Sequence, residues 1–439
     1  MKNSFMNRSM MSALRQWAKS PKRKPLVLQG ARQVGKTALL KELGRAEFGH
    51  VHYFNFEAEP ALATLFDGTL SPREIRPRLE AVAGGAITPR TLLVFDEVQS
   101  CKRALTSLKY FCEEAPEIPV AAAGSMLGVA VRPSDSGWPV GKVQTMTLAP
   151  MDFNEFLLAT GCERMLPIIE EAYRENRPME KILHDRLLRK VREYLVVGGM
   201  PEAVAAAKDA GTLDAATWEA VREIQTELIR NSLADMSGYA PPREAVRVEA
   251  CYRSIPAQLG KPNQKFMYRV VKSGATAARF EYAIDWLVNA GLVIPVRRVS
   301  SAERPLRLHE EDGAFKAFLM DAGLFGAMAG FRPADILDEA HSRTFGGLVE
   351  TFVAQSIRNV FPELHYWESN SQAEVDFLVE NSNGQIIAIE AKSGTSVQSK
   401  SLGVFLGRHP DARAMRLSEK NFGAPGPVRS VPLYAVGFV

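Results

Sequence analysis

Residues 30–37 read GARQVGKT, which matches the phosphate-binding pattern GxxxxGK[ST]. In this pattern backbone N–H groups surround a phosphate, the lysine reaches the β- and γ-phosphates, and the hydroxyl binds Mg²⁺. Lys36 would therefore be catalytic, and Thr37 would be a metal ligand in an ATP site. The residues expected to contact the nucleotide here are Gly30, Ala31, Arg32, Gln33, Val34, Gly35, Lys36, Thr37 and Ala38.

Two carboxylates end the apolar run LLVFDE, namely Asp96 and Glu97. Ligands of α/β sheets bind beyond the carboxyl ends of the strands, so this pair is expected to face the phosphates. Asp96 would bind in the Mg²⁺ shell, and Glu97 would polarise the attacking water. Ser125 follows the run VAAAG and is expected to be a polar sensor on the next strand. The alternative is a turn serine that caps a helix.

A second group of chemical residues lies in the last part of the chain. Asp376 lies in EVDFLV, whereas Glu390 and Lys392 lie two positions apart in AIEAK and so share one strand face. Glu350 lies on a helical pattern before them. Asp376, Glu390 and Glu350 would be oxygen ligands for a Mg²⁺ ion that activates water against a phosphodiester, with Lys392 stabilising the phosphate. The alternative is an ordinary ion pair on an exposed strand face.

The elements that would position the first site alternate between strands and helices. Helical patterns separate the apolar runs PLVLQG, VHYFNFE, TLLVFDE, PVAAAG and KVQTMTL. Such alternation predicts a parallel sheet covered on both faces by helices. For the second site we expect the helix FGGLVETFVAQSIRN, the strands LHYW, AEVDFLVE and QIIAIEAK, and a helix near Leu402.

The middle of the chain is helical in pattern from Met151 to about Glu244. A helix that ends at Gly291, followed by a short basic strand, is typical of a winged helix. The residues that would contact DNA phosphates are Arg269, Lys272, Arg279, Arg297 and Arg298. Glu281 and Asp285 on the same helix would repel DNA, so a scaffold or domain-docking role is the alternative.

Composition excludes some classes of protein. The chain has 439 residues, and no apolar run approaches the roughly 20 residues of a membrane helix. The start of the chain has no signal-peptide core, and four scattered cysteines fit a reducing cytoplasm, so we expect a cytoplasmic protein without membrane contact. Basic residues outnumber acidic ones up to His50, which suggests either a phosphate-binding patch or a solvated helix.

The order GARQVGKT, YFNFE, LLVFDEVQ, AAAGSM, GKVQTMTLAPMDFNEF closely resembles a bacterial and archaeal branch of the AAA+ ATPases. The resemblance continues in YLVVGGMPEAV and IPAQLGK, and it implies binding of ATP and Mg²⁺ with slow hydrolysis. Many relatives have arginine where this chain has Lys142, which puts an arginine finger at that position in doubt. Arg132 is a substitute candidate. The order helix-Glu, strand-Asp, strand-Glu-x-Lys resembles the PD-(D/E)XK nuclease superfamily over roughly the last hundred residues.

These observations predict an α/β protein with a P-loop parallel sheet, a helical and winged-helix region, and a C-terminal α/β nuclease-like domain. The expected domains are 1–155 (P-loop ATPase), 156–244 (helical), 245–335 (winged-helix-like) and 336–439 (nuclease-like). The predicted function is an ATP-driven switch that acts on or near DNA, with a protein partner or a homo-oligomer as further candidates. The alternative is a regulatory ATPase whose last domain binds without cutting.

Overall fold

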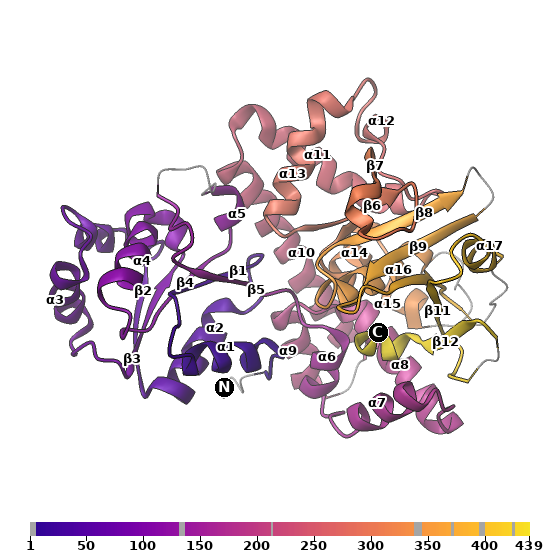
Figure 1. The fold of residues 1–439 in the computed structure, drawn as a ribbon, viewed down its shortest axis with the longest axis horizontal. Coiled ribbons are helices and arrows are strands. Elements are labelled where there is room, and N and C mark those ends of the chain that lie inside the picture. Colours follow the sequence, from indigo (N-terminus) through magenta and orange to yellow (C-terminus); the bar gives the residue numbers. More distant parts are fainter. Residues whose placement is uncertain are drawn as a thin grey trace. The chain divides into compact units, whose positions relative to one another are not determined.

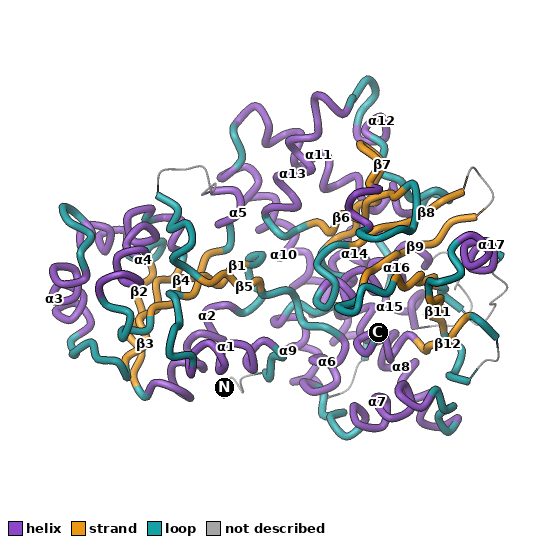
Figure 2. Tube along the Cα trace, viewed as in Figure 1, coloured by secondary structure: helices purple, strands orange, loops and turns teal. Residues whose placement is uncertain are grey.

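The computed structural model describes residues 6–130, 137–211, 214–337, 345–369, 373–394, 400–423 and 426–439. The chain divides into two compact units (Figures 1 and 2). Unit 1 comprises Met1–Ala149 and Asn289–Gly291, and unit 2 comprises Pro150–Val288 and Leu292–Val439. Within the described ranges, every helix is too short or too polar to cross a lipid bilayer.

Unit 1 contains a five-stranded sheet in the order β2-β3-β4-β1-β5, and all its pairs are parallel. Each strand falls on one of the five predicted apolar runs, so the predicted P-loop sheet is confirmed. The strands are β1 (Leu26–Gln29), β2 (His50–Asn55), β3 (Thr91–Asp96), β4 (Val120–Gly124) and β5 (Gln144–Thr147).

Helices cover both faces of this sheet. The α-helices of unit 1 are α1 (Met10–Lys19), α2 (Lys36–Leu43), α3 (Pro72–Ala83), α4 (Lys102–Glu114) and α5 (Leu127–Ala130). Three shorter segments are η1 (Gly44–Phe48), η2 (Pro60–Phe66) and η3 (Val98–Ser100). Because both faces are buried, β3 reads as a continuous apolar run, TLLVFD, and all six of its residues are buried.

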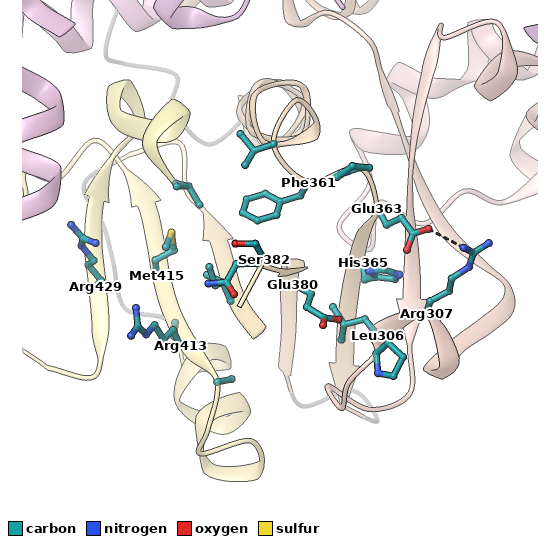
Figure 3. Close-up of a pocket in the computed structure, with 18 of the residues that line it drawn as sticks. Leu306, Arg307, Phe361, Glu363, His365, Glu380, Ser382, Arg413, Met415 and Arg429 are labelled. Atoms are coloured by element: carbon teal, nitrogen blue, oxygen red, sulfur yellow. Dashed lines mark ion pairs between the residues drawn. The ribbon is translucent and has the colours of Figure 1, made fainter. Parts of the chain in front are cut away.

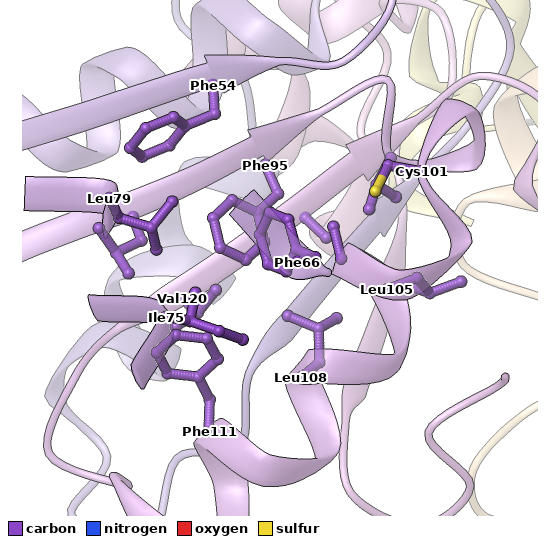
Figure 4. Packing of buried hydrophobic residues seen from close by; sticks show 14 of the residues in the cluster. Phe54, Phe66, Ile75, Leu79, Phe95, Cys101, Leu105, Leu108, Phe111 and Val120 are labelled. Carbon is purple, nitrogen blue, oxygen red and sulfur yellow. The ribbon is translucent and has the colours of Figure 1, made fainter. Parts of the chain in front are cut away.

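The core between the sheet and helices α3 and α4 is centred on Phe95 (Figure 4). Its ring meets those of Phe54, Phe66 and Phe111 edge to face, with centroids 6.0, 5.5 and 6.3 Å away. Such aromatic pairs add about 0.5–1.5 kcal/mol each beyond the area they bury. Since Phe95 precedes Asp96, this packing fixes the end of β3, where the first carboxylate of the predicted site begins.

Unit 2 contains a seven-stranded mixed sheet in the order β12-β11-β10-β9-β8-β6-β7. Its strands are β6 (Val293–Val299), β7 (Glu310–Leu319), β8 (Leu364–Ser369), β9 (Ala373–Glu380), β10 (Ile386–Ala391), β11 (Arg413–Ser418) and β12 (Val428–Pro432). The predicted C-terminal α/β architecture is therefore present, with strands on LHYW, AEVDFLVE and QIIAIEAK as expected.

The sheet also takes in the short basic strand that we expected in a separate winged-helix-like domain, β6, together with β7, which we did not predict. β6 pairs antiparallel with β7 and parallel with β8. The sheet therefore extends across the boundary expected between residues 335 and 336. The sequence gives no local sign of this, because the β6–β8 pairing joins segments that are far apart in the chain.

Helices make up the rest of unit 2. They are α6 (Phe153–Ala159), α7 (Met165–Glu175), α8 (Lys181–Val197), α9 (Pro201–Ala210), α10 (Ala215–Tyr239), α11 (Pro242–Leu259), α12 (Tyr268–Val271), α13 (Ala277–Asn289), α14 (Ala322–Ala329), α15 (Pro333–Leu337), α16 (Gly346–Arg358) and α17 (Ser401–Arg408). Short segments η4 (Leu306–His309) and η6 (Leu433–Phe438) complete it.

Helix α16 packs against β6, β7 and β10 and is buried from Gly347 to Ile357. A helix that is apolar and buried all round belongs to the core of a domain. Glu350 is the charged exception in this buried stretch, with a relative exposure of 7%. An ionised carboxylate at such a depth requires a partner.

Candidate functional site

The P-loop adopts the strained backbone that its glycines permit. Gly30 and Gly35 have φ values of 148° and 98°, and Gln33 between them has φ 64°. A Cβ atom on Gly30 would lie 2.2 Å from the carbonyl oxygen of Leu148, so no other residue fits there without a backbone shift. Gly35 then begins α2, which points its amino end, with its unpaired N–H groups, at the loop.

The other loop residues differ in what their side chains do. Ala31 and Val34 are buried and anchor the loop in the core, whereas Gln33 and Ala38 are exposed. The Arg32 guanidinium pairs with Glu57 at 2.7 Å. For these residues the backbone N–H groups, not the side chains, are the features suited to hold a phosphate.

Lys36 and Thr37 lie at the start of α2, where the pattern predicts them. The Lys36 side chain is 6% exposed, and its Nζ donates to the carbonyl oxygens of Gly30 and Ala31 over 2.9 and 2.8 Å. The ammonium is thus held at the mouth of the loop by neutral acceptors, which a phosphate oxygen can replace. Thr37 Oγ1 donates to Asp96 Oδ2 over 2.6 Å.

Asp96 accepts hydrogen bonds from side chains of two other elements of the site. It is 1% exposed, and its Oδ2 accepts hydrogen bonds from Thr37 and from the Tyr53 hydroxyl, each 2.6 Å long. Burial and the hydrogen bond to Asp96 raise the pKa of Tyr53 to about 12, so its hydroxyl stays a donor. Asn55 Nδ2 donates to the same hydroxyl over 3.1 Å. Tyr53 and Asn55 alternate on β2 in YFNFE, and this alternation was the available signal for them.

Glu97 follows Asp96 in a left-handed conformation with φ 49°. Its Oε2 accepts hydrogen bonds from Gln99 Nε2 over 2.6 Å and from Ser125 Oγ over 3.3 Å. The expected sensor Ser125 therefore contacts Glu97 from the end of β4. The contribution of Gln99, buried at 7% exposure, was not predicted from the sequence. Both bonds end on one carboxylate oxygen and fix the direction of this side chain.

Arg8 is a further residue without a motif of its own. Its side chain is buried at 8% exposure, and it donates to the carbonyl oxygens of Val34, over 2.8 Å, and Ala149, over 2.6 Å. The guanidinium therefore ties the P-loop to the segment that follows β5. In the sequence Arg8 is only one of many basic residues near the start of the chain.

Several other basic residues near the start of the chain have partners within unit 1. Arg15 and Lys19 both pair with Glu47, at 3.2 and 3.8 Å. Arg23 donates to the backbone carbonyls of Ala18 and Glu117. These contacts favour the interpretation of the segment as a helix with local partners over that of an open basic patch.

The candidates for an arginine finger gain no support. Lys142 Nζ pairs with Glu113 at 2.9 Å, a contact within unit 1 between side chains that are each more than a third exposed. Arg132 lies outside the described residues. An ammonium also lacks the planar fork with which arginine grips a phosphate.

In unit 2, the four residues predicted for the second site lie close together. Lys392 Nζ is 3.1 Å from Glu390 Oε1, and Arg416 Nε is 3.3 Å from Glu390 Oε2. The charges of Asp376 and Glu390, offsetting burial, raise the pKa of Lys392. Asp376 Oδ2 accepts from the backbone N–H of Ala391 over 2.9 Å.

Lys316 lies among these carboxylates and was not predicted. Its side chain is 0% exposed, and its Nζ lies 2.6 Å from Glu374 Oε1 and 3.9 Å from both Asp376 Oδ1 and Glu350 Oε2. It also donates to Gln264 Oε1 over 3.2 Å. A lysine is almost never fully buried unless it is paired. The signal in the sequence was a single lysine inside the apolar run AFKAFLM.

The protonation of the cluster follows from its burial. Burial, reinforced by the charge of Asp376, raises the pKa of Glu350 to about 8. Burial also raises the pKa of Asp376, against the opposing effect of Lys316. The cluster contains three cations, Lys316, Lys392 and Arg416, and four carboxyl groups, Glu350, Glu374, Asp376 and Glu390.

The predicted metal ligands Glu350, Asp376 and Glu390 each lie within 4 Å of a lysine ammonium of the chain itself. Among the described residues, no group of three His, Cys, Asp or Glu side chains could hold a metal. Mg²⁺ needs oxygens at about 2.0–2.1 Å in octahedral geometry. Several of the oxygens that would bind the ion have other partners. Glu390 is bonded by Lys392 and Arg416, Asp376 Oδ2 accepts from the backbone, and Gln264 Nε2 donates to Glu350 Oε1 over 2.7 Å. The Mg²⁺ site at these residues therefore stays a prediction without support from the contacts of the described residues.

The basic residues expected to form a DNA-binding wing also have acidic partners. Arg298 lies 3.3 Å from Glu311 and 2.8 Å from Glu368, and Arg297 lies 3.6 Å from Glu310. Trp286 is buried at 3% exposure and completes the apolar stripe of α13. These contacts favour the scaffold role of this region over direct DNA reading.

A separate cavity of about 1020 Å³ lies in unit 2 (Figure 3). The loop after β9, the end of α16 and strands β11 and β12 contribute to its lining, which includes Glu380, Phe361, Arg413 and Arg429. None of its lining residues belongs to the cluster around Lys316. The cavity therefore does not extend that cluster.

Comparison with family models divides the chain into three parts. Residues 22–157 match a family described as an AAA domain. Residues 188–335 and 345–426 match two families described as domains of unknown function, DUF8612 and DUF4143. A search of curated proteins found no significant match. The match and the loop geometry together make the first unit a P-loop domain of AAA type.

The solved structures that a comparison with this chain found include the Walker-type ATPase PABY2304 of Pyrococcus abyssi, at 15% identity, covering 74% of this chain and 97% of that chain with a TM-score of 0.46. The ORC2 protein of Aeropyrum pernix, in ADPNP–ADP complexes, has 12% identity, coverage of 77% and 96%, and a TM-score of 0.42. The ORC1 protein of the same organism, in complex with DNA, has 14% identity, coverage of 74% and 93%, and a TM-score of 0.30. TM-scores below 0.5 do not establish a shared overall fold, so no function is inferred from them.

Proposed function

We propose that this protein, whose residues 22–157 form a P-loop domain of AAA type, is a Mg²⁺-dependent ATP hydrolase that works as a switch. The observation that supports it best is the convergence of Thr37 and Asp96 through a 2.6 Å hydrogen bond beside the P-loop. A hydroxyl and a carboxylate at this distance are an oxygen pair that one Mg²⁺ ion can share. When bound with ATP, Mg²⁺ neutralises charge on the phosphate oxygens.

Phosphate binding is the task of the loop and of Lys36. The backbone N–H groups of residues 30–37 and the amino end of α2 provide donors and a positive dipole. Lys36 Nζ, which donates to Gly30 and Ala31, exchanges these neutral acceptors for oxygens of the β- and γ-phosphates. The charge-assisted bonds to phosphate are stronger than those to carbonyls, which drives the exchange.

Water activation is the task of Glu97. The water oxygen bonds to the γ-phosphorus, the bond from that phosphorus to the bridging oxygen of ADP breaks, and Glu97 accepts or orients the water proton. Gln99 and Ser125 hold Glu97 Oε2, which keeps the carboxylate pointing in one direction. A fixed carboxylate loses less entropy in reaching the transition state than a mobile one.

The experiment compares ATP hydrolysis by the full chain with that of Lys36→Ala and Glu97→Gln. We expect both to lose at least about a hundredfold in rate. Glu97→Gln should still bind Mg-ATP, because it leaves the loop and Lys36 intact. Lys109→Ala, an exposed lysine of α4, is the control and should keep full activity. Full activity in Lys36→Ala would show that hydrolysis takes place elsewhere.

A second proposal concerns unit 2, and the buried Lys316 supports it. We propose that the nuclease-like part of unit 2 does not cut nucleic acid and instead serves the ATPase as a binding module for a partner. Lys316 Nζ is bonded to Glu374 at 2.6 Å and lies 3.9 Å from Asp376 and Glu350, so a metal bound by these carboxylates would be repelled by its charge. The test is incubation of the full chain with plasmid and single-stranded DNA in Mg²⁺, in Mn²⁺ and in EDTA. DNA cleavage by the wild-type chain that is lost in Asp376→Asn would refute this proposal.

A further inference from the structure

We infer that the ammonium of Lys316 is a built-in cation that takes the place of a divalent metal in the nuclease-like centre of unit 2. This inference rests on the proposed function of unit 2 as a non-cleaving module, and it states what makes the centre non-cleaving. It concerns one side chain of β7 and the carboxylates around it.

The first support is the position of the charge. Lys316 Nζ lies within 4 Å of carboxylate oxygens from three residues, at 2.6 Å from Glu374 and 3.9 Å from both Asp376 and Glu350. Glu374 and Asp376 are two apart on β9 and Glu350 lies on α16, so the three come from two separate elements. A single cation at such a point offsets the repulsion between the Glu374 and Asp376 carboxylates and lies close to the Glu350 carboxyl group as well.

The second support is that the Lys316 ammonium is buried and enclosed by its partners. Its side chain is 0% exposed, so the ammonium cannot turn out to water. The ring of Tyr366 on β8 lies 5.4 Å from Nζ, and Gln264 Oε1 accepts from it over 3.2 Å. These groups enclose the ammonium, and leaving them would strand an unpaired buried charge.

The third support is the state of the remaining ligand oxygens. Asp376 Oδ2 accepts from the backbone of Ala391 at 2.9 Å, and Glu350 Oε1 accepts from Gln264 at 2.7 Å. Glu390 is held between Lys392 and Arg416. A divalent ion would have to break these bonds and also sit close to a fixed positive charge. Glu350 Oε2 has no hydrogen-bond partner and lies 3.9 Å from Lys316 Nζ, so a divalent ion at this oxygen would meet the fixed ammonium.

The strands explain how a lysine reaches this place. β7 is the edge strand beyond β6, and β6 pairs parallel with β8, which in turn pairs with β9. Figure 1 shows these strands side by side with α16. Incorporation of β6 and β7 into the sheet thus brings the Lys316 side chain to the carboxylates of β9.

The test counts bound Mn²⁺ by electron paramagnetic resonance in the nucleotide-free full chain. Asp96→Asn serves as the parent, so that the carboxylate of the ATP site does not contribute. We expect no difference in bound Mn²⁺ between the parent and the parent with Asp376→Asn. Adding Lys316→Ala to the parent should create one Mn²⁺ site. Its affinity for Mn²⁺ should be at least roughly a hundredfold higher than that of the same centre in the parent, because a positive charge at about 4 Å is removed. Asp376→Asn should abolish that new site.

The matched control is Lys265→Ala, which removes another lysine of unit 2 paired to a glutamate, Glu368, at 2.6 Å. This variant should gain no Mn²⁺ site. A soluble Lys316→Ala variant that gains none would overturn the inference. If that variant does not fold, the parent and its Asp376→Asn form still decide. Equal Mn²⁺ counts support the inference, and a lower count after Asp376→Asn overturns it.

The two proposals for unit 2 fail in different ways. Mn²⁺ binding that depends on Asp376 without DNA cleavage would overturn the role of Lys316 and leave the binding-module proposal standing. Asp376-dependent cleavage in EDTA, with no Mn²⁺ bound, would overturn the binding-module proposal and leave Lys316 as the resident cation. Metal-dependent cleavage would overturn both.

Discussion

The Tyr53 hydroxyl donates a hydrogen bond to Asp96 Oδ2 over 2.6 Å, and Thr37 donates to the same oxygen over the same distance. Two neighbouring strands and a helix therefore converge on one carboxylate oxygen at the end of β3. Tyr53 lies on β2, the strand beside β3. Its hydrogen bond should keep the Asp96 carboxylate oriented when the Thr37 hydroxyl binds a metal ion instead of Asp96. Asn55 in turn donates to the Tyr53 hydroxyl and fixes its direction.

Tyr53→Phe should raise the Mg²⁺ concentration that half-saturates ATP hydrolysis by about tenfold. The change removes one hydrogen bond to a charged group, which contributes about 1.5–3 kcal/mol, and leaves the ring in place. The measurement is ATPase rate against Mg²⁺ at saturating ATP. Tyr110→Phe, on α4, is the matched control. An unchanged Mg²⁺ dependence would mean that Tyr53 does not act through Asp96.

Gln99→Leu should lower kcat for ATP by about tenfold and leave KM nearly unchanged. The Gln99 side chain donates to Glu97 over 2.6 Å and so orients that carboxylate, and its loss should affect water orientation more than ATP binding. Steady-state kinetics separate the two constants. Gln144→Leu on the exposed part of β5 is the control. A rise in KM with constant kcat would contradict this role.

Arg8→Met should lower the free energy of unfolding of unit 1 by about 2–4 kcal/mol and weaken ATP binding. The buried guanidinium donates to Val34 and Ala149, and its removal leaves two carbonyls without this donor. Thermal melting with and without Mg-ATP measures both effects. Arg15→Met removes a half-exposed pair with Glu47 and should cost less than about 1 kcal/mol. Equal losses of unfolding free energy in the two variants would show that Arg8 does not stabilise the P-loop.

Unit 2 should lose stability as the pH falls below about 6.5, in part through His184. Burial lowers the pKa of His184, whose ring nitrogens contact the Tyr434 hydroxyl at 2.9 Å and the Glu419 carbonyl at 3.1 Å. The unfolded chain then binds more protons than the folded chain, so stability rises with pH through this window. His184→Gln should show a smaller loss between pH 7 and pH 5 in denaturant unfolding. An identical loss would assign the acid sensitivity to other groups.

The sequence predicted the first unit well because its information is local. The pattern GARQVGKT and the alternation of apolar runs with helical segments determine the loop and the sheet, and Asp96 follows from the end of a buried run. Tyr53, Gln99 and Arg8 were missed because their roles depend on contacts between segments with no shared motif. Their side chains are ordinary in the sequence and specific only once the strands are paired.

The second unit was predicted less completely for a related reason. The sequence grouped Glu350, Asp376, Glu390 and Lys392, and the structure brings them together. It showed Lys316 only as a lone lysine in an apolar run and did not connect it with the group, because that connection depends on the pairing of β6 with β8. The arginines expected in a wing were misinterpreted for the same reason, since Glu368, the partner of Arg298, comes from β8.

The origin of Lys316 has a practical consequence for work on isolated pieces of this chain. The matched region 345–426 contains all four predicted carboxylate and lysine residues but excludes β6 and β7. A fragment that starts after β7 would lack the Lys316 ammonium, leave one side of β8 unpaired, and leave Glu374 and Asp376 without that cation. Metal affinity measured in such a fragment would therefore result from the loss of β6 and β7. The metal affinity of this centre has to be measured in a chain that contains both strands.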